Sequence, residues 1–206
     1  MYGRMSTAAL VALTLAACAK QEAAKTPAAP AGPAKGTPEW KIQNAMSAGP
    51  AAIANAAGVM DYPATPDGQM TQLRAGTNGW TCMPDDPSTP SNDPVCADSV
   101  SFTWYGFWMQ HKPPRTRTVA LAYMLQGATD ASNTDPFKTK PDSGQPWVTT
   151  GPHVMIFVPD VKALQGISTD WRSGRPYVMW AGTPYAHLML PVAAAKAASD
   201  SMGGMD

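Results

Sequence analysis

The stretch TGPHVMIFVPD, residues 150–160, carries the clearest strand pattern in this chain of 206 residues. Side chains alternate along a β-strand, so residues i and i+2 lie on the same face. The stretch therefore has two faces, an apolar one of Val154, Ile156 and Val158, and a mixed one of His153, Met155 and Phe157. Histidine and methionine together on one face raise the question of whether that face packs in a core or binds a ligand.

A second stretch, PYVMWAGTPYAHLMLPV at residues 176–192, predicts a hairpin whose loop is Gly182–Pro184. This loop places Met179 opposite His187, and Tyr177 opposite Met189, with Cβ atoms about 5 Å apart. The other face of the hairpin is expected to point into the main core. It consists of Val178, Trp180, Ala186, Leu188 and Leu190.

If the strand at 153–158 neighbours this hairpin, five side chains share one face: His153, Met155, Met179, His187 and Met189. Imidazole and thioether are ligands that Cu(I) prefers, so this face is a candidate copper site, with His111 as a further ligand if the fold brings it near. The alternative is structural, because the chain has 13 methionines, which fill irregular gaps in cores, and each histidine could donate to a backbone carbonyl. A register shift of one residue would separate the ligands.

The remaining patterns predict an α+β fold, a mainly antiparallel sheet with one amphipathic, aromatic helix packed on it. The helix is expected over 97–110, with Asp98 or Ser99 as its N-cap. Its rings either pack on two sides or form a platform for a sugar or an aromatic ligand. Short helices are expected within 39–57, and further strands at 59–62, 69–74, 118–126 and 146–150.

Residues 80–96, WTCMPDDPSTPSNDPVC, predict a proline-rich loop closed by a disulfide between Cys82 and Cys96. The loop also carries four oxygen-bearing side chains that are candidate calcium ligands: Asp85, Asp86, Asn92 and Asp93. Asn and Asp beside proline more commonly bond their own backbone in turns, which is the alternative for this loop.

The first 18 residues combine Arg4, a short apolar run and Leu15-Ala16-Ala17-Cys18, which resembles the lipobox of bacterial lipoproteins. The resemblance implies that 1–17 are a signal peptide, that Cys18 carries acyl chains such as palmitate, and that this anchor makes the membrane a partner. Ala19 implies the periplasmic side of an outer membrane. Three segments are then expected: a disordered Ala/Pro-rich tether at 18–38, one domain at 39–193 and a flexible tail at 194–206.

Composition narrows the classes of function. The formal net charge is zero, which argues against a nucleic-acid partner. Glu22 and Glu39 are the only glutamates, so acid chemistry in the domain would use Asp or His. The sequence contains no nucleophile elbow, P-loop, zinc-protease motif or dinucleotide fingerprint. A small hydrolase that pairs a histidine with Asp135 or Asp160 stays open.

Five blocks, GTNGWTCMPD, SNDPVC, SNTDP, TGPH and GTPYAH, resemble a group of uncharacterised bacterial exported proteins. The blocks span roughly residues 76–190. The resemblance implies a shared fold and transfers no catalytic residue. It directs attention to a polar site formed by loops of these blocks, with Asn78, Asp135, His153 and His187 as its members.

From these patterns we expect a lipid-anchored envelope protein that is a non-catalytic binding or structural module. Its partner would be an envelope protein or a small ligand. The sequence makes no cofactor certain. A copper protein that binds Cu(I) on the His/Met face is the first alternative, and a small His/Asp hydrolase is the second.

Overall fold

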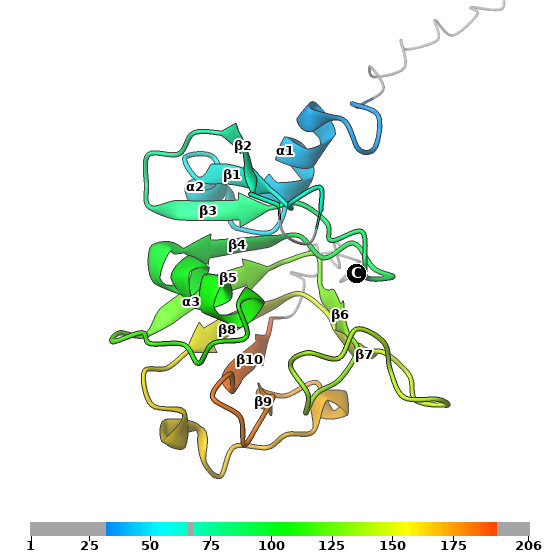
Figure 1. The fold of residues 1–206 in the computed structure, drawn as a ribbon, viewed down its shortest axis with the longest axis vertical. Helices are drawn as coiled ribbons and strands as arrows, with labels where there is room; N and C mark the ends of the chain where they lie inside the picture. Colours follow the sequence, from blue (N-terminus) through cyan, green and yellow to red (C-terminus); the bar gives the residue numbers. More distant parts are fainter. Residues whose placement is uncertain (1–31, 66–67, 193–206) are drawn as a thin grey trace, which may run out of the picture. The chain divides into compact units, whose positions relative to one another are not determined.

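The computed structural model describes residues 32–65 and 68–192, which form a mixed α and β structure around an eight-stranded sheet (Figure 1). The strand order across this sheet is β2-β1-β3-β4-β5-β8-β10-β9, and β6 and β7 form a separate two-stranded sheet. Neighbouring strands in the described residues are antiparallel except for β1 and β3, which are parallel. The predicted α+β class with a mainly antiparallel sheet is confirmed.

The helices are α1 (Pro38–Met46), α2 (Ala51–Ala54) and α3 (Ser99–Met109), and two 3-10 turns follow later, η1 (Val161–Leu164) and η2 (Trp171–Ser173). The first strands are β1 (Gly58–Asp61), β2 (Thr71–Arg74), β3 (Trp80–Met83), β4 (Val95–Asp98) and β5 (Ala120–Met124). The later strands are β6 (Ala128–Asp130), β7 (Val148–Thr150), β8 (His153–Phe157), β9 (Tyr177–Met179) and β10 (His187–Pro191).

The predicted signal peptide, the acylation at Cys18, part of the tether and the tail at 194–206 lie outside the described residues. Thr37 caps α1, because its hydroxyl accepts from the backbone N–H of Trp40 at 3.2 Å. Regular structure therefore begins inside the segment 18–38 that was predicted as a tether. Among residues 32–65 and 68–192, no helix combines the length and hydropathy that crossing a bilayer requires.

The predicted register of the two decisive stretches is confirmed. In the β9–β10 pair, Met179 lies opposite His187, and Tyr177 lies opposite Met189. Strand β8 pairs with β10, and there Met155 lies directly opposite Met189. Because alternation is kept along these strands, the imidazoles and thioethers of β8, β9 and β10 share one face of the sheet.

The two faces of the sheet carry separate hydrophobic clusters. Cys96 faces a cluster with α1, whereas its neighbours Val95 and Ala97 face a larger cluster with α3, so the two helices cover opposite faces. In Figure 1, α3 lies across β4 and β5. The main core is therefore the His/Met face. The prediction that Val178 and Ala186 enter the main core is wrong, because they pack in a smaller cluster with Leu164.

Trp180 breaks the alternation of its hairpin. Its backbone has a positive φ of 55°, in the left-handed region that non-glycine residues seldom adopt. This conformation ends β9 and turns the indole to the side of Met179, where Trp180 joins the main core. Alternation had predicted the opposite side. The Trp180 indole N–H donates to the carbonyl of Ser132 at 2.9 Å, which holds the ring in place.

The disulfide between Cys82 and Cys96 is confirmed, but it does not close a simple loop. The two cysteines lie directly opposite each other in the β3–β4 pair. Each strand has four residues and borders prolines, so its pattern was too short to predict a strand. The disulfide thus joins two neighbouring strands of the sheet, on the face that α1 covers.

Asp98 connects α3 to the sheet. It is the last residue of β4 and the N-cap of α3, where its Oδ1 accepts from the backbone N–H of Ser101 at 2.7 Å. Its Oδ2 accepts from the backbone N–H of Leu121 in β5 at 2.7 Å. The buried Ser101 hydroxyl donates to the Leu121 carbonyl at 2.7 Å. One carboxylate therefore fixes both the start of the helix and its position over the sheet.

Replacement of Asp98 by Ala should lower the free energy of unfolding by about 3 kcal/mol, since it removes a helix cap and a charged hydrogen bond to β5. Asp98→Asn keeps the capping oxygen and should lose about 1 kcal/mol. Asp160 caps only the short turn η1, so Asp160→Ala should lose less than about 1 kcal/mol. Urea unfolding followed by tryptophan fluorescence measures all three. Equal losses for Asp98→Ala and Asp160→Ala would contradict the anchoring role.

Candidate functional site

An inner cavity of about 160 Å³ lies between α3 and the His/Met face of the sheet. All five residues of the predicted copper face line it: His153, Met155, Met179, His187 and Met189. The helix contributes Trp104, Tyr105 and Trp108 to the opposite wall. An engineered core cavity of ~150 Å³ accommodates benzene, so this space suits an ion or a ligand of a few heavy atoms.

Strand pairing arranges the lining side chains in three rows across the sheet. The middle row holds Met155 and Met189, directly opposite each other. One outer row holds His153, with Met124 of β5 opposite it. The other outer row holds His187, with Met179 opposite it. The two thioethers of the middle row therefore lie between the two imidazoles.

Each imidazole is oriented by its own strand. His153 Nδ1 lies 2.7 Å from the carbonyl oxygen of Gly151, and His187 Nδ1 lies 3.0 Å from that of Tyr185. A carbonyl oxygen only accepts, so Nδ1 carries the proton in both rings and Nε2 keeps its lone pair. Because β8 and β10 are antiparallel, both anchoring carbonyls lie on the outer side of the rows. The Nε2 atoms therefore face the middle row.

The Nε2 atom of His153 is buried and has no hydrogen-bond partner among the described residues. Such an atom costs free energy unless a ligand or solvent satisfies it. Burial lowers the pKa of His153 to about 4, partly offset by the hydrogen bond to Gly151. Burial also lowers the pKa of His187 to about 4, with a smaller contribution from the neighbouring His153. Both rings are therefore neutral at physiological pH.

Aromatic rings enclose His187. Phe157 stacks beside it with ring centroids 5.1 Å apart, while Trp104 and Trp180 meet it edge-on at 5.7 and 5.1 Å. The Tyr105 hydroxyl donates to the sulfur of Met155 at 3.5 Å. These contacts show that the sites of the helix rings are packing positions as well as cavity walls.

A second, wider cavity of about 380 Å³ adjoins the inner one, and we call it the vestibule. The two spaces share Asp130, Thr129, Trp108 and Trp180 among their lining residues. Burial, with a contribution from Asp93, raises the pKa of Asp130 to about 7. Asp93 itself is buried, and burial raises its pKa to about 6 against the hydrogen bonds that it accepts.

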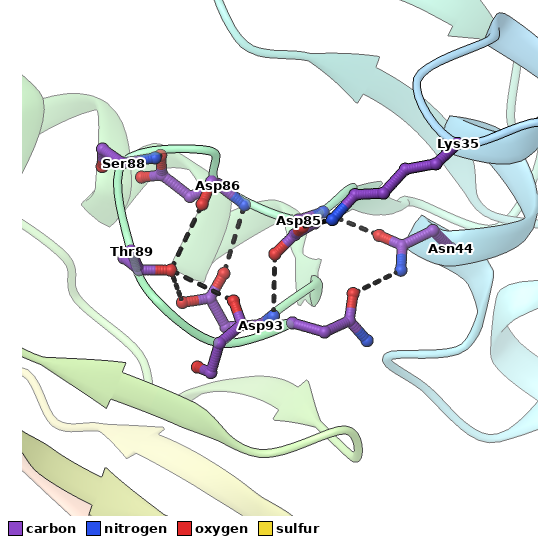
Figure 2. Close-up of polar contacts among 9 residues, drawn as sticks. Lys35, Asn44, Asp85, Asp86, Ser88, Thr89 and Asp93 are labelled. Atoms are coloured by element: carbon purple, nitrogen blue, oxygen red, sulfur yellow. Dashed lines mark hydrogen bonds and ion pairs between the residues drawn. The ribbon is translucent and has the colours of Figure 1, made fainter.

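The aspartates of the loop before β4 act as turn formers. Figure 2 shows Asp86 and Thr89 donating to the carboxylate of Asp93, at 3.1 and 2.6 Å. Asp85 lies 3.4 Å from the ammonium of Lys35 and accepts from the backbone N–H of Asp93. Asn92 accepts from Asn44 of α1 at 2.7 Å. Internal partners therefore occupy oxygens that a calcium ion would need.

Two members of the predicted polar site do not reach the histidines. Asn78 donates to the carbonyl of Ile53 and accepts from Trp80 N–H, in a turn before β3 and outside both cavities. Asp135 accepts from Phe137 N–H and lines the vestibule. Of the four members, the inner cavity brings together only His153 and His187.

The remaining predicted residues also lie apart from the inner cavity. His111 stacks on Phe137 in the vestibule, with ring centroids 4.0 Å apart. Asp160 accepts from the backbone N–H of Lys162 and caps η1. A His/Asp hydrolase gains no support, because the ring N–H of each inner histidine is held by a carbonyl.

Comparison with known protein families, curated proteins and solved structures found no match to this chain. Within the part of the chain that the structure describes, no group of three or more His, Cys, Asp or Glu side chains gathers in a metal-binding arrangement. Any metal in the inner cavity would therefore depend on the methionine sulfurs as well as the imidazoles.

Sequence reasoning missed Met124, Asp130 and Asp93 as cavity residues. Met124 could have been found, because the strand predicted at 118–126 places it on the same face as Ala120 and Ala122. Asp130 follows Gly127, whose φ of +85° turns the chain out of β5 into β6. No local pattern indicates that this turn brings a carboxylate to the junction of two cavities.

The four shifted groups predict a pH profile of stability in which opposite effects meet. As pH falls from about 6.5 toward 4, the unfolded chain protonates His153 and His187 before the native chain does, which lowers the free energy of unfolding. As pH falls from about 7 toward 4, the native chain protonates Asp130 and Asp93 first, which raises it. The profile of the unmodified protein should therefore be nearly flat between pH 7 and 4.5.

Asp130→Asn removes one stabilising contribution, so between pH 7 and 4.5 its free energy of unfolding should fall by about 2 kcal/mol more than that of the unmodified protein. Urea unfolding at three pH values measures this difference. Asp160→Asn, at an exposed cap, should follow the unmodified profile. Parallel profiles for all three proteins would contradict the shifted pKa of Asp130.

Proposed function

We propose that the protein is a non-catalytic binding module that holds Cu(I) in its inner cavity. The observation that carries this proposal is the buried Nε2 atom of His153, which has no partner among the described residues and faces a row of methionine sulfurs. The proposed ligands are His153, Met155, His187 and Met189, with Met179 beside His187.

The chemistry of the lining favours a soft cation. Nitrogen and sulfur lone pairs gather on the sheet side, where His153 and His187 keep Nε2 unprotonated. The nearby indole N–H groups of Trp108 and Trp180 are bound to carbonyls of Pro136 and Ser132, so they offer these lone pairs no proton. Thioether and imidazole donors bind Cu(I) in preference to hard cations such as Mg²⁺ or Ca²⁺.

The surroundings of the imidazoles match those of metal-binding histidines. A metal-bound histidine commonly donates its second ring N–H to a carboxylate or a backbone carbonyl, which fixes the tautomer and the ring orientation. His153 and His187 both do so. Their lowered pKa values keep the nitrogens free of protons that would compete with a metal.

We propose further that the module is exported and attached to the membrane through Cys18. The lipobox-like sequence at 15–18 supports this location. The disulfide between Cys82 and Cys96 also supports it, because such bonds persist mainly in oxidising compartments such as the periplasm. The membrane, and an envelope protein that exchanges the metal, would be the partners.

Competition for Cu(I) between the protein and a coloured chelator tests the metal site, with ascorbate as a reductant. The unmodified protein should withdraw one equivalent of Cu(I). Met155→Leu combined with Met189→Leu nearly conserves side-chain volume, and should weaken Cu(I) binding by at least about 100-fold. His187→Ala should weaken it as well.

Met60→Leu combined with Met70→Leu is the matched control, because these two methionines lie outside the inner cavity and should leave Cu(I) binding unchanged. A circular dichroism spectrum of each variant checks that it is folded. The copper proposal fails if the unmodified protein does not compete for Cu(I), or if the Met155/Met189 variant competes as well as the control.

A further inference from the structure

We propose that the vestibule binds an organic ammonium ion, a cation whose charge is surrounded by alkyl groups. This inference concerns a second ligand and does not depend on copper in the inner cavity. The vestibule, at about 380 Å³, is within the size range of small-molecule sites. Its walls combine the aromatic residues Trp108, His111, Phe137, Trp147 and Trp180 with the acidic residues Asp86, Asp130 and Asp135.

The aromatic walls are held in fixed orientations. The rings of Trp108 and Trp180 are nearly parallel, with centroids 5.9 Å apart and an interplanar angle of 14°. The Trp108 N–H donates to the carbonyl of Pro136 at 3.0 Å, and the Trp180 N–H donates to that of Ser132. The polar edges of both indoles are thereby used, and ring surface remains. Aromatic faces attract cations whose charge lies within about 6 Å.

Hydrogen-bond donors of the vestibule are largely used inside the protein. The Thr89 hydroxyl donates to Asp93 at 2.6 Å, and the Lys138 ammonium donates to Asp142 at 2.6 Å. The hydroxyls of Thr129 and Ser132 are paired with Ser91 and Thr134. A phosphate or carboxylate ligand would find few free donors and three carboxylates. The vestibule therefore selects against anions and in favour of cations.

Asp130 supplies the charge at the inner end of the vestibule. No hydrogen bond or ion pair within the described residues engages its carboxylate, whereas Asp86 and Asp135 each accept from a backbone N–H. The groups that face Asp130 are Asp93, Tyr105 and Tyr177, none of which is positively charged. A cation in the vestibule would provide the missing counter-charge, and its alkyl groups would contact the indoles.

Choline is the probe, and 3,3-dimethylbutan-1-ol is its neutral isostere. At pH 8, where Asp130 is mainly ionised, choline should quench tryptophan fluorescence saturably and release heat in a calorimeter. The neutral alcohol should bind at least about tenfold more weakly, because it lacks the charge. Asp130→Asn should weaken choline binding by at least about tenfold, since it removes the carboxylate and keeps its shape.

Three controls separate this site from its surroundings. Asp160→Asn makes the same change of charge outside the vestibule, and should leave choline binding within about twofold. The Met155→Leu/Met189→Leu variant should also bind choline normally, because its changes lie in the inner cavity. Thermal unfolding confirms that Asp130→Asn is folded, which the loss of a buried unpaired carboxylate favours.

The inference is overturned by any of three results. The first is equal binding of choline and its neutral isostere. The second is unchanged choline binding in Asp130→Asn. The third is loss of choline binding in the Met155→Leu/Met189→Leu variant, which would place the cation in the inner cavity. Failure of the copper experiment alone leaves the vestibule proposal intact, so the two proposals fail separately.

Discussion

The carboxylate of Asp98 determines how the two sides of the candidate site face each other. It ends β4, begins α3 and binds the backbone of β5, so the helix cannot shift along the sheet without breaking charged hydrogen bonds. Beneath the helix the sheet presents small residues, Ala97, Ala120 and Ala122. They let the aromatic side chains of α3 approach the strands, whereas the larger His and Met side chains on β8 and β10 meet the helix across the inner cavity. The cavity is thus a consequence of where one polar side chain holds the helix.

Strand alternation predicted the face of the site, and it did so because β8, β9 and β10 are regular. A turn at Gly182–Pro184 is enough to place Met179 beside His187, and the hydrophobic pattern leaves little freedom for a different register. The same reasoning missed β3 and β4, because four-residue strands between prolines carry too few alternations to be recognised. It also failed at Trp180, where a left-handed residue reverses the side of the ring. Regular strands can be derived from sequence, whereas single unusual backbone angles cannot.

The polar part of the site was less accessible to prediction. Asn78 and Asp135 were expected beside the histidines, but both stabilise local turns, as Asn and Asp near glycine and proline commonly do. The carboxylate that does adjoin the inner cavity, Asp130, comes from the short β6–β7 sheet, and its place depends on pairing between segments about twenty residues apart. Contacts of this kind follow from tertiary structure. They have no signature in the neighbouring residues.

The two histidines are aimed by carbonyls that precede them by two positions on the same strand, Gly151 for His153 and Tyr185 for His187. The direction of each ring is thus encoded within a tripeptide, Gly-Pro-His or Tyr-Ala-His, and needs no help from a distant side chain. Residues around the cavity can accordingly vary in size or chemistry while the nitrogens keep their bearing. Such local encoding makes the pair of strands a transferable unit: the same two tripeptides, set on antiparallel neighbours of another sheet, would again turn their free nitrogens toward one another.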